Sequence, residues 1–154
     1  MLTPLRESSL ATRQAKVVVT GLPSDSHTWN LVFLQLYLEE RGHQVVNLGP
    51  CVPDETLTRE CARHQPDLVV VSSVNGHGRA DGLRVIRKLR NRPELVGVPI
   101  VIGGKLGTTG AQSTADLTAL VDAGFDAVFD DNASTDPFGQ FLESLTVQQG
   151  ALRS

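Results

Sequence analysis

The stretch Leu68-Val69-Val70-Val71-Ser72 decides the fold, because it is apolar and β-branched almost without a break. Two further stretches share this composition, Lys16-Val17-Val18-Val19-Thr20 and Pro99-Ile100-Val101-Ile102-Gly103. A strand with one face in water would alternate polar and apolar residues. These runs therefore predict strands buried on both faces, as in a parallel sheet covered by helices. Two weaker strands are predicted at residues 44–47 and 126–129.

Amphipathic segments of helical length separate the predicted strands. Residues 29–41 carry Leu31, Leu34 and Leu38 at spacings of three and four, which places them on one face of a helix. Gly42 follows at the position where a helix commonly ends by turning left-handed. This segment is therefore predicted to be a helix that packs its leucines against the sheet.

Four more helices are predicted further along the chain. The first has Pro53 in its first turn, and the second covers residues 83–90. The third covers residues 113–123 and ends before Gly124, and the last runs from Asp136 to about residue 147. In the second of them the apolar residues recur at helical spacing, so its arginines are expected to face solvent: Arg84, Arg87 and Arg90.

The strands and helices alternate five times with short connections. Because such crossovers are right-handed, the order predicts a flavodoxin-like, doubly wound α/β fold. Its sheet has five parallel strands in the order 2-1-3-4-5, with helices on both faces. The domain is predicted to span residues 15–147, with flexible tails at residues 1–14 and 148–154.

Composition narrows the possible classes of function. The chain has 154 residues, 40% of them hydrophobic, and a net charge of −3, which argues against a strongly basic nucleic-acid-binding protein. It has no secretory signal pattern and no apolar run approaching the roughly 18 residues of a membrane span. Its two cysteines, Cys51 and Cys61, lie outside any C-x-x-C pattern and fit a reducing compartment. We therefore expect a cytoplasmic domain with neither nucleic acid nor membrane as a partner.

Ligands of such sheets bind beyond the carboxyl ends of the strands, near the switch in strand order. The loops expected there, residues 21–28, 72–78 and 103–110, are small, polar and rich in glycine. They lack the acidic residues of a phosphoryl-accepting receiver, having Thr20-Gly21 and Ser72-Ser73 instead. They also lack the hydroxyl-rich first loop of a flavodoxin, and neither a dinucleotide-binding nor a Walker-type glycine pattern is present.

Asp25-Ser26-His27 is the most informative part of the first loop. In extended backbone, residues two apart point the same way, so the carboxylate can accept the imidazole Nδ1–H and leave Nε2 facing outward. This arrangement is typical behind metal-ligating histidines. From these residues alone, a local role such as capping the next helix stays open. A zinc site is disfavoured, because His43 and His64 belong to distant elements. A single histidine needs a metal that carries its other ligands.

Three loop motifs together resemble the cobalamin-binding domain family, and within it the small subunit of glutamate mutase (methylaspartate mutase). The family pattern D-x-H-x-x-G, S-x-L and G-G corresponds to Asp25–Asn30, Ser72–Val74 and Gly103-Gly104, and the resemblance covers about residues 16–145. It implies that His27 is the lower axial ligand of cobalt and that Asp25 orients it. It also implies that the displaced nucleotide tail of the cofactor enters between the sheet and the first helix, where Ser72 meets the benzimidazole. The further implied cofactor contacts are Ser24, Ser26, Thr28, Ser73, Val74, Gly103, Gly104, Lys105, Leu106 and Gly107.

The sequence departs from the family pattern at two positions. Val74 replaces a leucine, a change that should be tolerated. Asn30 replaces the glycine, and it either narrows the entry for the nucleotide tail or adopts the left-handed conformation that asparagine tolerates. Trp29 belongs either to the core or to a cover over the tail. The roles of His77 and Lys105 stay open as well.

The resemblance implies an isomerase subunit that uses adenosylcobalamin. The expected reaction is the radical interconversion of L-glutamate and threo-3-methylaspartate. This chain supplies no catalytic residue beyond the cobalt ligand and no substrate-binding cluster. Because a radical needs an enclosed site, a larger partner must cover the cofactor, and the resemblance implies that this partner is a TIM-barrel subunit in a heterotetramer.

Two other functions stay open at this point. One is the cobalamin subunit of another mutase, of the acyl-CoA or methyleneglutarate type. The other is a non-enzymatic corrinoid carrier or sensor. Those proteins usually have a helical cap domain upstream, whereas only 24 residues precede Asp25 here. The mutase subunit is therefore the preferred interpretation.

Overall fold

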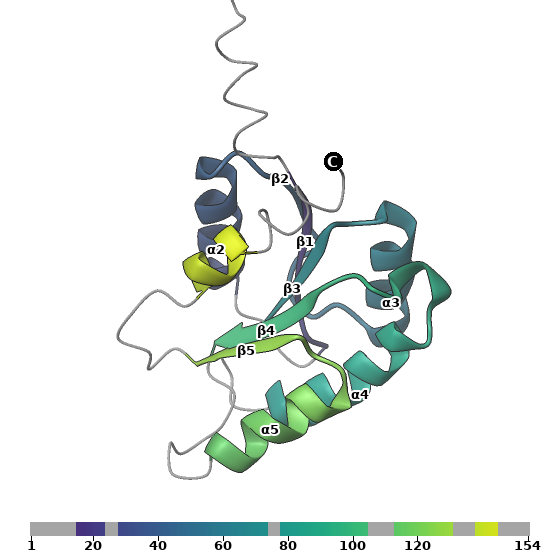
Figure 1. Ribbon diagram of the computed structural model, residues 1–154. Coiled ribbons are helices and arrows are strands. Elements are labelled where there is room, and N and C mark those ends of the chain that lie inside the picture. The colour runs from purple at the N-terminus through teal and green to yellow at the C-terminus, as the bar shows by residue number, and fades with distance from the viewer. Residues whose placement is uncertain (1–14, 24–27, 74–77, 105–112, 131–137, 145–154) are drawn as a thin grey trace, which may run out of the picture.

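Five parallel strands form one sheet in the order β2-β1-β3-β4-β5 (Figure 1). The computed structural model describes residues 15–23, 28–73, 78–104, 113–130 and 138–144. The predicted strand order and the flavodoxin-like architecture are confirmed. The strands are β1 (Lys16–Gly21), β2 (Gln44–Asn47), β3 (Leu68–Ser73), β4 (Ile100–Gly104) and β5 (Ala127–Asp130).

The central strands are buried on both faces, as their unbroken apolar sequence predicts. Val69 and Val71 of β3 point into one hydrophobic core, and Val70 between them points into the other. Successive side chains of a strand face opposite sides of the sheet, so a strand between two helical layers needs apolar residues at every position.

Helices cover the two faces of the sheet (Figure 1). On one face lie α2 (Trp29–Glu40) and the helical residues 138–144, which contribute Leu31, Leu38 and Leu142 to their core. The other face is covered by α3 (Asp54–His64), α4 (Gly78–Arg90) and α5 (Ser113–Ala123), and a short 3-10 helix, η1 (Pro93–Leu95), precedes β4.

The ends of the helices agree with the sequence in part. Gly42 and Gly124 follow α2 and α5 with φ of +90° and +138°, as expected for helix-ending glycines. Pro53 precedes α3 as its N-cap and is not in its first turn. Helix α4 begins at Gly78, before the predicted 83, because its first turn is polar and leaves no apolar period to detect.

The prediction that the arginines of α4 all face solvent is correct for Arg84 and Arg87 and wrong for Arg90. Arg90 is half-buried, and its guanidinium donates to the carbonyl oxygens of Gly124 at 3.0 Å, Leu95 at 3.2 Å and Val98 at 2.9 Å. These carbonyls belong to the chain that leads into β4 and β5. A long side chain in the last turn of a helix can reach such groups while its stem stays packed.

Some predicted boundaries lie outside the described residues. They are the tails 1–14 and 148–154 and both ends of the last helix, at Asp136 and residue 147. No helix in the described part of the chain has both the length and the apolar character of a membrane-spanning segment.

Candidate functional site

Three small residues lie level with one another at the carboxyl edge of the sheet. The strand register pairs Gly21 of β1 with Ser72 of β3, and Ser72 with Gly103 of β4. Ser72 is buried, with 4% of its surface exposed. A Cβ atom at Gly103 would lie 3.3 Å from the carbonyl oxygen of Phe129, so a larger residue would press against β5. We call Gly21, Ser72 and Gly103 the edge row.

Five of the cofactor contacts implied by the family resemblance belong to the described residues. Thr28, Ser72, Ser73, Gly103 and Gly104 all lie at the carboxyl edge of the sheet or at the start of α2. The other implied contacts lie outside the described residues: Ser24, Asp25, Ser26, His27, Val74, Lys105, Leu106 and Gly107.

The segment 24–27 joins two well-defined anchors. Leu22 is fully buried directly after β1, and Thr28 occupies the N-cap position of α2. The Thr28 carbonyl oxygen accepts the amides of Leu31 at 3.0 Å and Val32 at 3.1 Å, although its side chain makes no capping bond. The described part of α2 therefore begins directly after Thr28, and His27 lies outside the described residues.

Asn30 contacts the edge row directly. It is the second residue of α2, and its Nδ2 donates a hydrogen bond to Ser72 Oγ. The left-handed explanation for Asn30 is wrong, because this residue is helical and the described non-glycine residues with positive φ are Cys51 and Gln65. The other explanation, that Asn30 narrows the entry for the nucleotide tail, stays a prediction, and the contact with Ser72 is consistent with it. The signal in the sequence was the departure from glycine, but only the fold identifies Ser72 as the partner.

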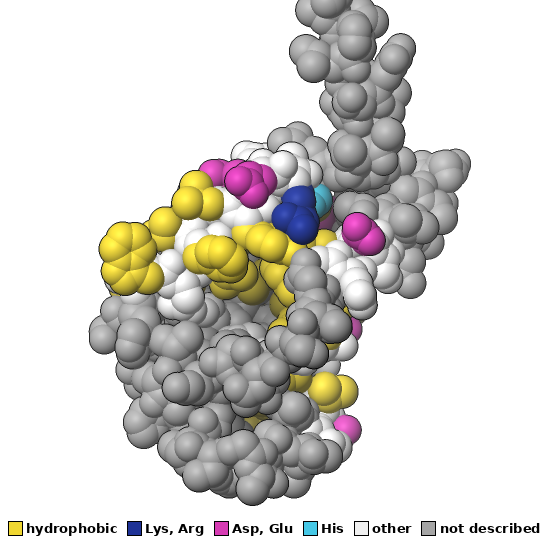
Figure 2. Space-filling model, turned by 90° about the vertical axis from the view of Figure 1, so that its left-hand side faces the viewer, with side chains coloured by type: hydrophobic (Ala, Val, Ile, Leu, Met, Phe, Trp, Pro, Cys, Tyr) yellow, Lys and Arg dark blue, Asp and Glu magenta, His cyan; other side chains and the backbone are white. Residues whose placement is uncertain are grey.

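Trp29 does not belong to the core, because 84% of its surface is exposed. Phe33 and Leu36 are also exposed, one and two turns further along the same helix. Figure 2, which views the molecule from the side of α2, shows hydrophobic side chains gathered on this face. We call Trp29, Phe33 and Leu36 the apolar stripe. Its signal in the sequence is that α2 has apolar residues beyond the buried face of Leu31, Leu34 and Leu38.

The titratable groups with shifted pKa values serve the scaffold. The hydrogen bond from Arg84, with Nε and Oδ2 2.7 Å apart, lowers the pKa of Asp54 and joins α3 to α4. Burial lowers the pKa of His43, and burial raises the pKa of the Cys61 thiol to about 12. Among the described residues, no three His, Cys, Asp or Glu side chains gather in a way that could hold a metal ion.

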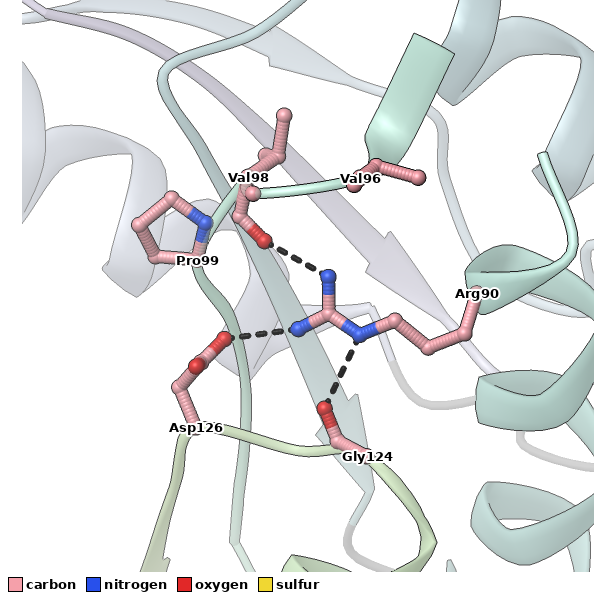
Figure 3. A pocket seen from close by; sticks show the side chains of 7 residues that line it. Arg90, Val96, Val98, Pro99, Gly124 and Asp126 are labelled. Atoms are coloured by element: carbon pink, nitrogen blue, oxygen red, sulfur yellow. Dashed lines mark hydrogen bonds and ion pairs between the residues drawn. The ribbon is translucent and has the colours of Figure 1, made fainter. Parts of the chain in front are cut away.

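A cavity of about 440 Å³ lies at the opposite, amino edge of the sheet (Figure 3). Arg90 and Asp126 provide its charged groups, and Val96, Val98 and Pro99 provide much of the remaining wall. The guanidinium of Arg90 donates to protein carbonyls and to the Asp126 carboxylate, as the dashed lines in Figure 3 show for three of these bonds. Because these donors serve protein groups, the cavity is a weaker ligand site than the carboxyl edge.

Sequence comparison finds a matching family model and similar proteins. A family model described as the B12 binding domain matches residues 15–136. The chain is 29% identical to the glutamate mutase sigma subunit of Fusobacterium nucleatum, over 74% of this chain and 83% of that protein. It is 30% identical to the sigma subunit of Halobacterium salinarum, over 73% of this chain and 74% of that protein.

Solved structures share the fold at low sequence identity. A cobalamin-binding protein from Desulfitobacterium hafniense has a TM-score of 0.62 and 19% identity, over 89% of this chain and 58% of that one. A response regulator from Chloroflexus aurantiacus has a TM-score of 0.64 and 15% identity, over 88% of this chain and 99% of that one. The receiver interpretation still fails on the residues, because Ser72 stands near the end of β3 where a receiver needs an aspartate.

Proposed function

The chain belongs to the family of B12-binding domains, and from this premise we propose that it is the cobalamin-binding small subunit of a glutamate mutase. The assembled enzyme would interconvert L-glutamate and threo-3-methylaspartate with adenosylcobalamin as its cofactor. The sequence similarity to glutamate mutase sigma subunits, over about three quarters of the chain, favours this mutase over the acyl-CoA and methyleneglutarate types.

The observation that carries the proposal is where the D-x-H segment sits in the chain. The described residues on either side of it, Gly21 at the end of β1 and Thr28 at the N-cap of α2, lie at the same edge as the buried hydroxyl of Ser72. The residues of this edge fit a large planar cofactor, because the edge row presents two glycines and one small polar residue. A corrinoid with a displaced nucleotide tail requires an axial ligand, a hydroxyl for its base, and an edge of the sheet without bulky side chains.

Each residue would have a limited task. His27 would hold the cobalt through Nε2, and Asp25 would accept its Nδ1–H, which fixes the tautomer and the ring orientation. Ser72 would donate to, or accept from, the base of the nucleotide tail. When bound, adenosylcobalamin supplies radical chemistry through homolysis of its cobalt–carbon bond. This chain would hold the cofactor and leave the substrate to its partner.

The proposed partner is the large subunit of the mutase. A radical needs an enclosed site, and the carboxyl edge of a single small domain leaves one side of a corrin open to solvent. The apolar stripe begins at Trp29, shortly after the proposed ligand residue in sequence, and would provide apolar area next to that open side. This position supports a contact between the stripe and the subunit that covers the cofactor. We propose a heterotetramer.

The axial ligand is tested by spectroscopy of the assembled protein. The full chain, together with a large glutamate mutase subunit, is loaded with cobalamin and reduced to the cobalt(II) form. Electron paramagnetic resonance should then show nitrogen hyperfine coupling from a protein imidazole, which 15N-histidine labelling identifies. The coupling should be absent in His27→Ala and retained in His77→Ala, the matched control from another predicted loop.

Two outcomes would count against the proposal. A signal from the benzimidazole nitrogen of cobalamin in place of histidine would remove His27 as the ligand. Cobalamin binding without isomerisation of glutamate would favour the other mutase types or the corrinoid carrier.

Asp25→Asn should weaken cobalamin binding by roughly 10- to 100-fold, as is typical when the partner of a ligating histidine is lost.

A further inference from the structure

Asn30 and Ser72 join α2 to the edge row. The two residues are 42 positions apart in sequence, and their side chains meet through the hydrogen bond from Asn30 Nδ2 to Ser72 Oγ. Ser72 is buried, and Asn30 is half-buried in the first turn of α2. The bond therefore ties the start of the helix to the end of the central strand.

The residues beside Ser72 make this contact important for any ligand. Gly21 and Gly103 flank Ser72 in the sheet and contribute no side chain, so the hydroxyl is the polar side-chain group of the edge row. Asn30 covers that hydroxyl from the side of α2. A ligand group that enters between α2 and the sheet to reach Ser72 must first displace the carboxamide of Asn30.

We infer that Asn30 is a specificity-determining residue that gates the nucleotide tail of a corrinoid at Ser72. The inference rests on the proposed function. Rotation of the Asn30 side chain about its own torsions releases Ser72 without a change in the helix backbone, so the gate opens locally. A corrinoid without a nucleotide tail has no group to place there and binds without opening the gate. Binding of cobalamin with its tail in place therefore costs the hydrogen bond between Asn30 and Ser72, whereas binding of a corrinoid without a tail does not.

The test compares two corrinoids on two variants. Cobalamin carries the nucleotide tail, whereas cobinamide has the same corrin ring and lacks it. The full chain, in the presence of a large glutamate mutase subunit, is dialysed to equilibrium against each corrinoid, and the bound amount is measured by absorption. Asn30→Ala removes the carboxamide and keeps a good helix-forming residue.

Asn30→Ala should bind cobalamin about 2- to 10-fold more tightly than the natural chain, the range that one neutral hydrogen bond represents. Its affinity for cobinamide should be unchanged. In the Ser72→Ala background the further change Asn30→Ala should bring no gain, because the bond it releases is already absent. Asn47→Ala is the matched control. Asn47 also bridges two elements, with Nδ2 3.1 Å from Gln35 Oε1, and its loss should affect both corrinoids equally.

The outcomes separate this inference from the proposed function. If Asn30→Ala binds both corrinoids more tightly by the same factor, or cobalamin no more tightly, Asn30 is not a gate for the tail. A role limited to helix stability would change the melting temperature without changing the ratio of the two affinities, and would also overturn the inference. If the natural chain binds neither corrinoid, the proposed function fails and the gate with it.

Discussion

The carboxylate of Asp126 holds the guanidinium of Arg90, with Oδ2 and Nη2 2.7 Å apart, and the same oxygen accepts the amide of Ile100 at 2.8 Å. Asp126 lies just before β5, Ile100 begins β4, and Arg90 ends α4. One carboxylate therefore joins the amino ends of two neighbouring strands to a helix.

Arg90→Met should lower the free energy of unfolding by about 2 kcal/mol, because it keeps the packed stem but removes a donor from half-buried carbonyl oxygens. The affected carbonyls are those of Gly124, Leu95 and Val98. Arg87→Met is the control on the exposed face of the same helix, and it should change stability by no more than about 0.5 kcal/mol. Urea unfolding measures both, and equal losses would refute the structural role of Arg90.

Gly124→Ala should destabilise the protein more than Gly42→Ala does. Both glycines have positive φ, which costs alanine roughly 1–2 kcal/mol. At Gly124 a Cβ atom would in addition lie 3.0 Å from Ile86 Cγ1 and 3.0 Å from Arg90 Cγ, whereas at Gly42 nothing lies within 4 Å. The difference between the two melting temperatures isolates this steric contribution. Equal losses would show that the chain near Gly124 relaxes freely.

His43 should make the protein less stable as the pH falls below about 6.5. Its Nδ1 accepts the amide of Ala15 at 3.1 Å, and burial, assisted by Arg41, lowers its pKa from the ordinary value of 6.5, against an opposing effect of Asp67. Between the folded and unfolded pKa values the unfolded chain binds more protons, so acidification favours unfolding. The stabilisation is complete above the unfolded pKa and is lost as the pH falls toward the folded one.

The variant His43→Asn keeps an acceptor and cannot titrate. Urea unfolding at pH 7.5 and pH 5.5 should therefore show a smaller loss of stability on acidification for the variant than for the natural chain. An identical loss in both proteins would exclude His43 as the titrating group.

Cys51 and Cys61 should differ in reactivity toward an aromatic disulfide reagent. Cys51 is exposed, whereas Cys61 is a buried core residue of α3 and its pKa is raised to about 12. Because the thiolate is the reacting form, Cys61 should stay unmodified in the native protein and react after denaturation. The variant Cys51→Ser should abolish the rapid native reaction, and a rapid reaction in that variant would contradict the burial of Cys61.

The apolar stripe should contribute to binding of the proposed large subunit. Trp29→Ala and Phe33→Ala should each weaken that association by roughly tenfold, because exposed aromatic residues commonly dominate such interfaces. Val96→Ala is the control, since Val96 is also exposed but lies at the opposite edge of the sheet (Figure 3). Calorimetric titration of the cobalamin-loaded chain measures the affinity. Equal effects of all three changes would exclude a specific role for the stripe.

The sequence by itself determined the sheet, because strands buried on both faces must be apolar at every position. The runs around Val18, Val70 and Val101 satisfy that requirement, and the alternation with helices then permits few strand orders. The same strand order predicts where the loops with the family motifs lie, because the carboxyl ends of parallel strands meet at one edge of the sheet.

Only the tertiary structure decided which side chains meet one another at the two edges of the sheet and which stay exposed. Asn30 reaches Ser72, Arg90 turns inward to three carbonyls, and Trp29 stays outside the core. Periodicity along one element determines which face is buried. The partner of a polar side chain depends on the crossing of two elements distant in sequence, and that crossing is fixed by packing of the whole core.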